Sequence, residues 1–137
     1  MAANTLPIYS KAGDVQWSAA AITSANTAKD GTGTVTTVFT AGVDGGRVEK
    51  LVFQPLGTNV ATVARIFVNN GQSNATPANN AYFKDVTLPA STLSENASMP
   101  AVEVPLNLAL PSGYRLLVTL GTAIAAGVMV TVVGGKY

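Results

Sequence analysis

The 137-residue sequence contains neither cysteine nor histidine. Without cysteine the chain can form no disulfide framework, and it offers no thiolate to a metal ion. Without histidine it lacks the side chain that most often serves as a general base near neutral pH and that most often binds transition metals. We therefore predict no catalytic residues, no metal site and no cofactor.

Charged residues are scarce, at 11% of the sequence, against about 25% in a typical soluble domain. The basic residues are spread singly from Lys11 to Lys136, and the net charge is +1. Because nucleic-acid binding needs clustered cations that neutralise phosphates, we predict no nucleic-acid partner. A surface of Thr, Asn, Ser, Gly and Ala is unusual for a free monomer, which suggests that much of it contacts other protein.

Long hydrophobic runs are also missing. The first residues, MAANTLPIYSKAGD, do not follow the pattern of a signal peptide, in which a basic segment precedes an apolar one. The longest apolar stretch, residues 121–133, is too short and too interrupted to span a bilayer. We expect no membrane partner and, with no cysteine, synthesis in a reducing cytoplasm.

The sequence instead repeats short runs of Val, Thr, Phe and Ile that end at Gly, Asn, Pro or Asp, a pattern typical of strands and turns. We predict one antiparallel β-sandwich of about eight strands, jelly-roll-like, with an immunoglobulin-like sandwich as the alternative. One short helical turn is expected within residues 90–97. The predicted strands are residues 15–22, 34–40, 47–54, 61–69, 81–88, 101–110, 114–121 and 127–133.

The clearest strand is VEVPLNLAL, residues 102–110, in which large apolar residues alternate with other types. This period of two predicts one buried and one outward face. Pro105 cannot donate to a ladder, so the strand should lie at a sheet edge or carry a bulge. Residues 65–68 and 128–133 are apolar on both faces, which indicates either a subunit contact on the outside of the sandwich or only the strand preference of Val and Thr.

The stretch ANTAKDGTGT, residues 25–34, could be a phosphate loop, a metal loop or a turn. A P-loop is excluded because the lysine precedes the glycines and a strand follows them. A calcium site would need more carboxylates than Asp30, unless Asp44 of the similar VDGG turn lies nearby. Asp-Gly pairs are typical turn dipeptides, so we interpret the stretch as a turn leading into residues 34–40.

Other chemistry has little support in the sequence. The seven carboxylates mostly lie in turns or beside a basic residue, as in Glu49-Lys50 and Lys84-Asp85, and are interpreted as solvated surface ions. Ser10 and Lys11 are adjacent, so on a strand they would point to opposite faces. Carbohydrate binding through stacked aromatic side chains remains an alternative. Its candidates are Tyr9, Trp17, Tyr82, Phe83, Tyr114 and Tyr137.

Three segments read NTAKDGTGTVTTVFTAGVDGGRVEKLVFQPLGT, ARIFVNNG and LPSGYRLLVTLGT. Together they resemble small virion proteins of tailed bacteriophages, which share N-T-x-x-D-G-T-G, V-F-T-A-G, a Gly-rich turn, a strand of the R-[IL]-x-[FV] kind and L-P-x-G-[YW]. The match covers residues 26–133 in outline, with gaps, and consists of turn and strand signatures. The resemblance implies a jelly-roll-like structural protein, most plausibly a capsid cement or decoration protein, without catalytic residues.

We therefore expect a virion protein, made in the cytoplasm of the bacterial host, that binds the major capsid protein on the capsid surface as a homotrimer. A tail, baseplate or fibre component is the alternative within the virion. Residues 1–13 should form an extended N-terminal arm that holds a neighbour, and residues 14–137 the sandwich. The residues predicted to make contacts are Leu6, Pro7, Ile8, Tyr9 and Trp17.

Overall fold

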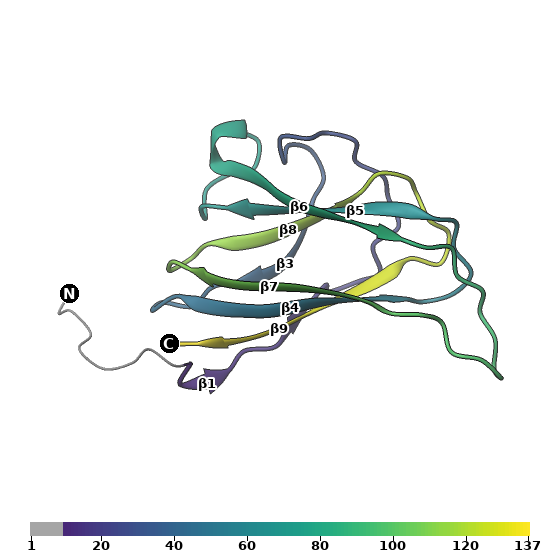
Figure 1. Ribbon diagram of the computed structural model, residues 1–137. Coiled ribbons are helices and arrows are strands. Elements are labelled where there is room, and N and C mark those ends of the chain that lie inside the picture. Colours follow the sequence, from purple (N-terminus) through teal and green to yellow (C-terminus); the bar gives the residue numbers. More distant parts are fainter. Residues whose placement is uncertain (1–9) are drawn as a thin grey trace.

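In a computed structural model, which describes residues 10–137, the chain forms two antiparallel β-sheets that pack face to face (Figure 1). The predicted β-sandwich is therefore confirmed. The described residues contain one short 3₁₀ turn, η1 (Pro77–Asn79), and otherwise only strands and loops. The helical turn expected within residues 90–97 is wrong, because that segment has an irregular conformation in the loop between β6 and β7.

The first sheet, sheet A, has the order β7-β4-β9, and both β1 and β2 pair with the free edge of β9. The second, sheet B, has the order β3-β8-β5-β6. The strands of sheet A are β1 (Ala12–Gly13), β2 (Gln16–Trp17), β4 (Gly46–Pro55), β7 (Val102–Leu110) and β9 (Val128–Lys136). Those of sheet B are β3 (Thr36–Thr40), β5 (Thr62–Asn69), β6 (Asn80–Leu88) and β8 (Arg115–Leu120).

Each predicted strand beyond the first coincides with an observed one to within about three residues at either end. The predicted strand 15–22 is reduced to β2, and the cause lies at Ser18. The backbone N–H of Ser18 still donates to Val130, but the N–H of Val130 donates to the Ser18 hydroxyl (3.1 Å). The Ser18 hydroxyl thus replaces a backbone carbonyl as the acceptor, and the regular backbone pairing of β2 with β9 ends there. Within the predicted arm, Ala12 and Gly13 pair with β9.

The core lies between the sheets and follows the predicted alternation. In β7, Val104 and Leu110 are buried, whereas Glu103, Pro105 and Asn107 are exposed. Pro105 lies on an edge strand beside an irregularity in the pairing with β4, as its missing N–H requires. The fully buried large side chains come from both sheets, and include Phe39, Leu51, Phe53, Ile66, Leu116 and Leu120.

The two long sides of the sandwich differ. On one side the side chain of Gln16 in β2 bridges to β3: its amide donates to the Thr40 carbonyl (2.9 Å), and its oxygen accepts from the Thr40 N–H (2.9 Å). On the other side β6 and β7 are both edge strands, and no hydrogen bond joins them in the part of the chain that the structure describes. The sandwich is therefore closed along β2 and β3 and open along β6 and β7.

Candidate interaction surface

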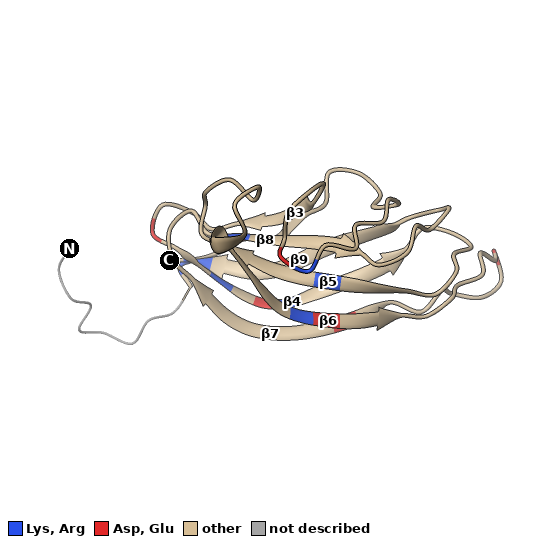
Figure 2. Cartoon of the chain, turned by 90° about the horizontal axis from the view of Figure 1, so that it is seen from above, with Lys and Arg blue, Asp and Glu red and all other residues tan. Residues whose placement is uncertain are grey.

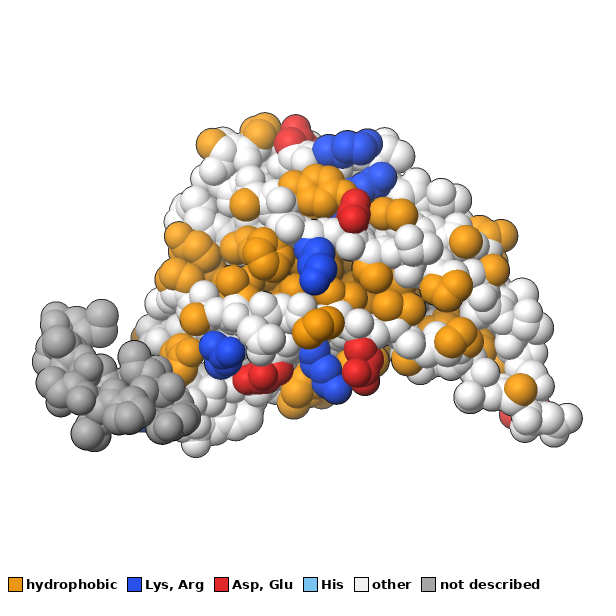
Figure 3. All heavy atoms as spheres, in the orientation of Figure 1, with side chains coloured by type: hydrophobic (Ala, Val, Ile, Leu, Met, Phe, Trp, Pro, Cys, Tyr) orange, Lys and Arg blue, Asp and Glu red, His pale blue; other side chains and the backbone are white. Residues whose placement is uncertain are grey.

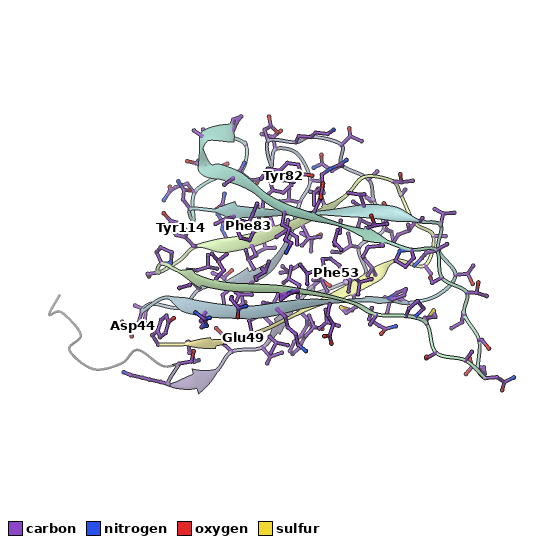
Figure 4. The ribbon with its side chains drawn as sticks, viewed as in Figure 1. Asp44, Glu49, Phe53, Tyr82, Phe83 and Tyr114 are labelled. Carbon is purple, nitrogen blue, oxygen red and sulfur yellow. The ribbon has the colours of Figure 1, made fainter. Side chains whose placement is uncertain are left out.

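The open side of the sandwich, between β6 and β7, exposes apolar side chains that belong to the core layer. We call this surface the open edge. Figure 3 shows hydrophobic side chains gathered in a band along it. Phe83, which lies on this side of the molecule in Figure 4, is 45% exposed. The partly buried residues packed against the core here are Val86, Val102, Leu106 and Leu108, with Val68 and Tyr114 toward one end.

A bulge in β6 determines which of its side chains face the open edge. Tyr82 pairs with Phe67 and Lys84 with Ile66, so Phe83 is an extra residue between two pairs. Because Ile66 points into the core, Lys84 points toward the core side of the edge strand, yet it is exposed. Inward-pointing charges on edge strands hinder edge-to-edge aggregation.

Lys84 and Asp85 are both exposed, as expected for solvated surface ions, and they lie on opposite faces of β6. Asp85 also accepts a hydrogen bond from the Tyr82 hydroxyl (2.7 Å). Lys84 has no carboxylate within 4 Å among residues 10–137. The two ion pairs in this part of the chain are Arg47–Glu49 (3.2 Å) and Lys50–Glu103 (3.3 Å), both exposed on sheet A. Figure 2 shows how few charges the strands carry.

The β7 side of the open edge is poorly suited to pairing with another strand. Pro105 removes one backbone donor, and Asn107 has φ 49°, a left-handed conformation that breaks the regular ladder. The pairing of β7 with β4 is irregular between Val48 and Lys50. Since prolines and bulges block strand addition, the open edge is a surface for apolar side chains more than for a complete strand.

A loop at one end of the sandwich presents both an apolar and an acidic side chain. This loop, residues 89–101 (the end loop), connects β6 to β7 and projects from the body at the lower right of Figure 1. Ser91 anchors its base by donating to the Gly57 carbonyl (2.6 Å). Leu93 is 55% exposed, and Glu95 is the only charged residue in the loop.

Part of the outer face of sheet B is buried, in contrast to the open edge. Phe67, Asn69 and Leu117 are at most 2% exposed although they alternate with core residues. The stretch 25–34 is tied to this side of the molecule by asparagine side chains. Asn74 donates to the carbonyls of Gly31 (3.0 Å) and Gly33 (2.9 Å). Phe67, the large apolar side chain on the outer face of β5, packs against the Tyr82 ring of β6, with ring centroids 5.0 Å apart.

The stretch 25–34 is a turn, as interpreted from the sequence, but one whose conformation depends on distant residues. Gly31 has φ 79°, the conformation expected for the glycine of an Asp-Gly turn. The side-chain amide of Asn80, 50 residues further along the chain, donates a hydrogen bond to the Asp30 carbonyl (3.0 Å). The Thr32 hydroxyl and backbone N–H both donate to the Asp30 carboxylate and lower the pKa of that group. Within residues 10–137, no three acidic side chains are placed to hold a metal ion.

The candidate aromatic residues do not form one platform. Trp17, 61% exposed, lies opposite Thr131 at the β2 edge of sheet A. Tyr82 lies on the far edge strand of sheet B and packs against Phe67, with ring centroids 5.0 Å apart. Tyr114 is partly buried at the start of β8. Among residues 10–137, Trp17, Tyr82 and Tyr114 are therefore not placed side by side for stacking on a sugar. Leu6, Pro7, Ile8 and Tyr9 lie outside the described residues.

Tyr82 is expected to ionise at higher pH than an ordinary tyrosine. Burial raises the pKa of its phenol, and the hydrogen bond to Asp85 raises it further, because both favour the neutral form. An absorbance titration of the folded protein should show one late tyrosinate phase, which Tyr82→Phe should remove. Since the pKa is raised on folding, the stabilisation is complete below the unfolded value and is lost as the pH rises through the folded one. A Tyr82→Phe variant with the same late phase as the wild-type chain would contradict this.

Comparisons of the chain with protein-family models, with curated proteins and with solved structures find no match. Among residues 10–137, no helix has the length and apolar character needed to cross a membrane. Of the open-edge residues, the sequence singled out Phe83 and Tyr114, as candidates for stacking on a carbohydrate, but it did not predict the open edge itself. Leu106 and Leu108 were assigned to a buried face, and the signal that could have found the edge is the combination of Pro105 in β7 with inward-facing Lys84 in β6.

Proposed function

We propose that this chain is a virion structural protein of a tailed bacteriophage, and that it binds and stabilises the head shell as a capsid decoration protein. The observation that carries the proposal is the open edge, where apolar side chains of the core layer face solvent in a chain with 11% charged residues. Such a patch on a sparsely charged surface is typical of a protein that contacts other protein. The sequence resemblance to small virion proteins is the reason for proposing a phage particle as the assembly.

We propose the jelly-roll form for the sandwich, and the strand order supports it. If β1 and β2 are taken as one edge strand, eight strands remain, and their pairing is nested. The first pairs with the last, β3 with β8, β4 with β7, and β5 with β6. This order results when a long antiparallel pair folds over into two sheets. An immunoglobulin-like sandwich would pair its second strand with its fifth, whereas here the second pairs with the seventh.

The proposed mechanism is mechanical. Each copy would bury a modest area of apolar and polar surface against the major capsid protein and against other copies of itself, as a homotrimer. Because the copies are held together, the release of one contact leaves the others in place, and weak contacts add up to stable attachment. The scarcity of charge fits this role, since few side chains must be desolvated as ions when the surface is covered.

Mass spectrometry and cryo-electron microscopy of purified particles whose genome encodes this chain test the proposal. We expect the protein in the particles, in copies that repeat over the icosahedral lattice of the head. A few copies at a vertex, tail or baseplate would contradict the decoration role and move the function to a tail or fibre component. Particles that lack the protein would overturn the virion role altogether.

The contribution of the predicted N-terminal arm can be tested in the same system. Because its residues Leu6, Pro7, Ile8 and Tyr9 lie outside the described part of the chain, their role stays a prediction. A variant that lacks residues 1–9 should keep the melting temperature of the full chain, because β1 begins at Ala12. It should be incorporated less well into particles. Equal incorporation of the shortened and full chains would show that the arm is not needed.

A further inference from the structure

Two exposed features of the chain are complementary in chemistry and lie on different parts of its surface. The open edge offers apolar contact around Phe83 and an amine on Lys84 that has no carboxylate within 4 Å among the described residues. The end loop offers the apolar side chain of Leu93 and, two residues further on, the carboxylate of Glu95. Both surfaces offer apolar contact, and their charged groups are opposite in sign.

We infer that copies of this chain assemble head to tail, with the end loop of one copy docked on the open edge of the next. Leu93 packs on the apolar band beside Phe83, and Glu95 pairs with Lys84. The occupant of the open edge is therefore a second copy of the chain. The inference rests on the proposed function in one respect, that the protein works as an oligomer.

The position of the end loop favours contact between copies over contact within one chain. Its base is held to the body through Ser91 and through the Leu93 N–H, which donates to the Thr58 hydroxyl (3.0 Å). Beyond these anchors, residues 92–98 are exposed and the loop projects away from the sandwich (Figure 1). An anchored projection can reach a neighbour at little entropic cost, because its base is already ordered.

The arrangement of the two surfaces also determines the symmetry. Because the end loop and the open edge are different surfaces, the contact is heterologous: each copy uses its loop on one neighbour and receives a loop from another. A heterologous contact closes into a ring when the rotation between copies is suitable, and a trimer is the smallest ring with a true head-to-tail order. The features of β7 that oppose strand addition, Pro105 and Asn107, direct the contact to side chains.

A charge exchange tests the pairing on the isolated full chain. Lys84→Glu and Glu95→Lys, made singly, should each weaken association roughly tenfold or more, because they place like charges together. The double variant should recover most of the wild-type association, since the pair is restored with its signs reversed. Sedimentation equilibrium measures the association constants, and thermal unfolding checks that each variant is folded. Leu93→Ser should also weaken association.

Lys29→Glu is the matched control, because Lys29 is an exposed lysine in the stretch 25–34 and the change in net charge is the same. It should leave association unchanged. A wild-type chain that is monomeric at every soluble concentration would overturn the inference, as would single variants that associate like the control or a double variant that does not recover. A monomer that still decorates particles would refute this contact but not the proposed function. An oligomer that shows the expected charge behaviour but is absent from particles would support the contact and refute the proposed function.

Discussion

Replacing Asn59 with alanine should lower the free energy of unfolding by about 3 kcal/mol. The Asn59 side chain is buried, with 7% of the residue exposed, and satisfies three backbone groups of another loop. Its amide donates to the Gly127 carbonyl (2.9 Å), and its oxygen accepts from the N–H groups of Ala126 (2.8 Å) and Gly127 (3.2 Å). Alanine would leave these groups buried without partners, and each such group costs about 1–3 kcal/mol.

The effect of Asn59→Ala should extend to the end loop, because the backbone of Asn59 exchanges two hydrogen bonds with Ser91. Urea denaturation followed by tryptophan fluorescence or circular dichroism measures the loss. Asn70→Ala is a suitable control, since the Asn70 side chain bonds only within the connection between β5 and β6, to Gln72 and Asn79, and less than about 1 kcal/mol should be lost there. If both variants lose the same small amount, water replaces the amide of Asn59 and the proposed role of that side chain is wrong.

Gly45→Ala should destabilise the protein by a similar amount, about 3 kcal/mol, for two separate steric reasons. Gly45 has φ 88°, a conformation that costs a residue with a side chain about 1–2 kcal/mol. In addition, a Cβ atom at this position would lie 2.7 Å from the carbonyl oxygen of Leu110, which is backbone and cannot move aside easily. The turn that leads into β4 would have to shift.

Gly42 provides the control for this substitution, because it lies three residues earlier in the same turn and accepts a hydrogen bond from the Gly45 N–H (3.0 Å). Its φ is not in the left-handed region, and a Cβ there would meet nothing within 4 Å. Gly42→Ala should therefore change the stability by less than about 0.5 kcal/mol. Denaturant unfolding of both variants measures the difference, and equal effects of the two alanines would show that Gly45 has no special steric role.

The sequence by itself determined all predicted strands after the first and the inward side of the clearest one. Alternation in residues 102–110 assigned Val104 and Leu110 to the core, and the Asp-Gly dipeptides placed turns at Gly31 and Gly45. These features depend on neighbours in the chain, since the period of a strand is two and a turn involves four residues. The first strand was mispredicted because Ser18 accepts a bond from a strand more than 100 residues away.

Only the tertiary structure decided which outward surfaces are covered and which are left open. Phe67 and Lys84 both lie on strands that the sequence predicted, yet Phe67 is covered from outside whereas Lys84 remains exposed beside the apolar band. Phe67 packs against Tyr82 of the neighbouring strand, and the stretch 25–34 is bound by Asn74 and Asn80, residues 41 to 50 positions away. The alternation of residue types along a strand predicts which way a side chain points. Whether another segment covers that side chain depends on residues far apart in the sequence, and is therefore decided only in the folded chain.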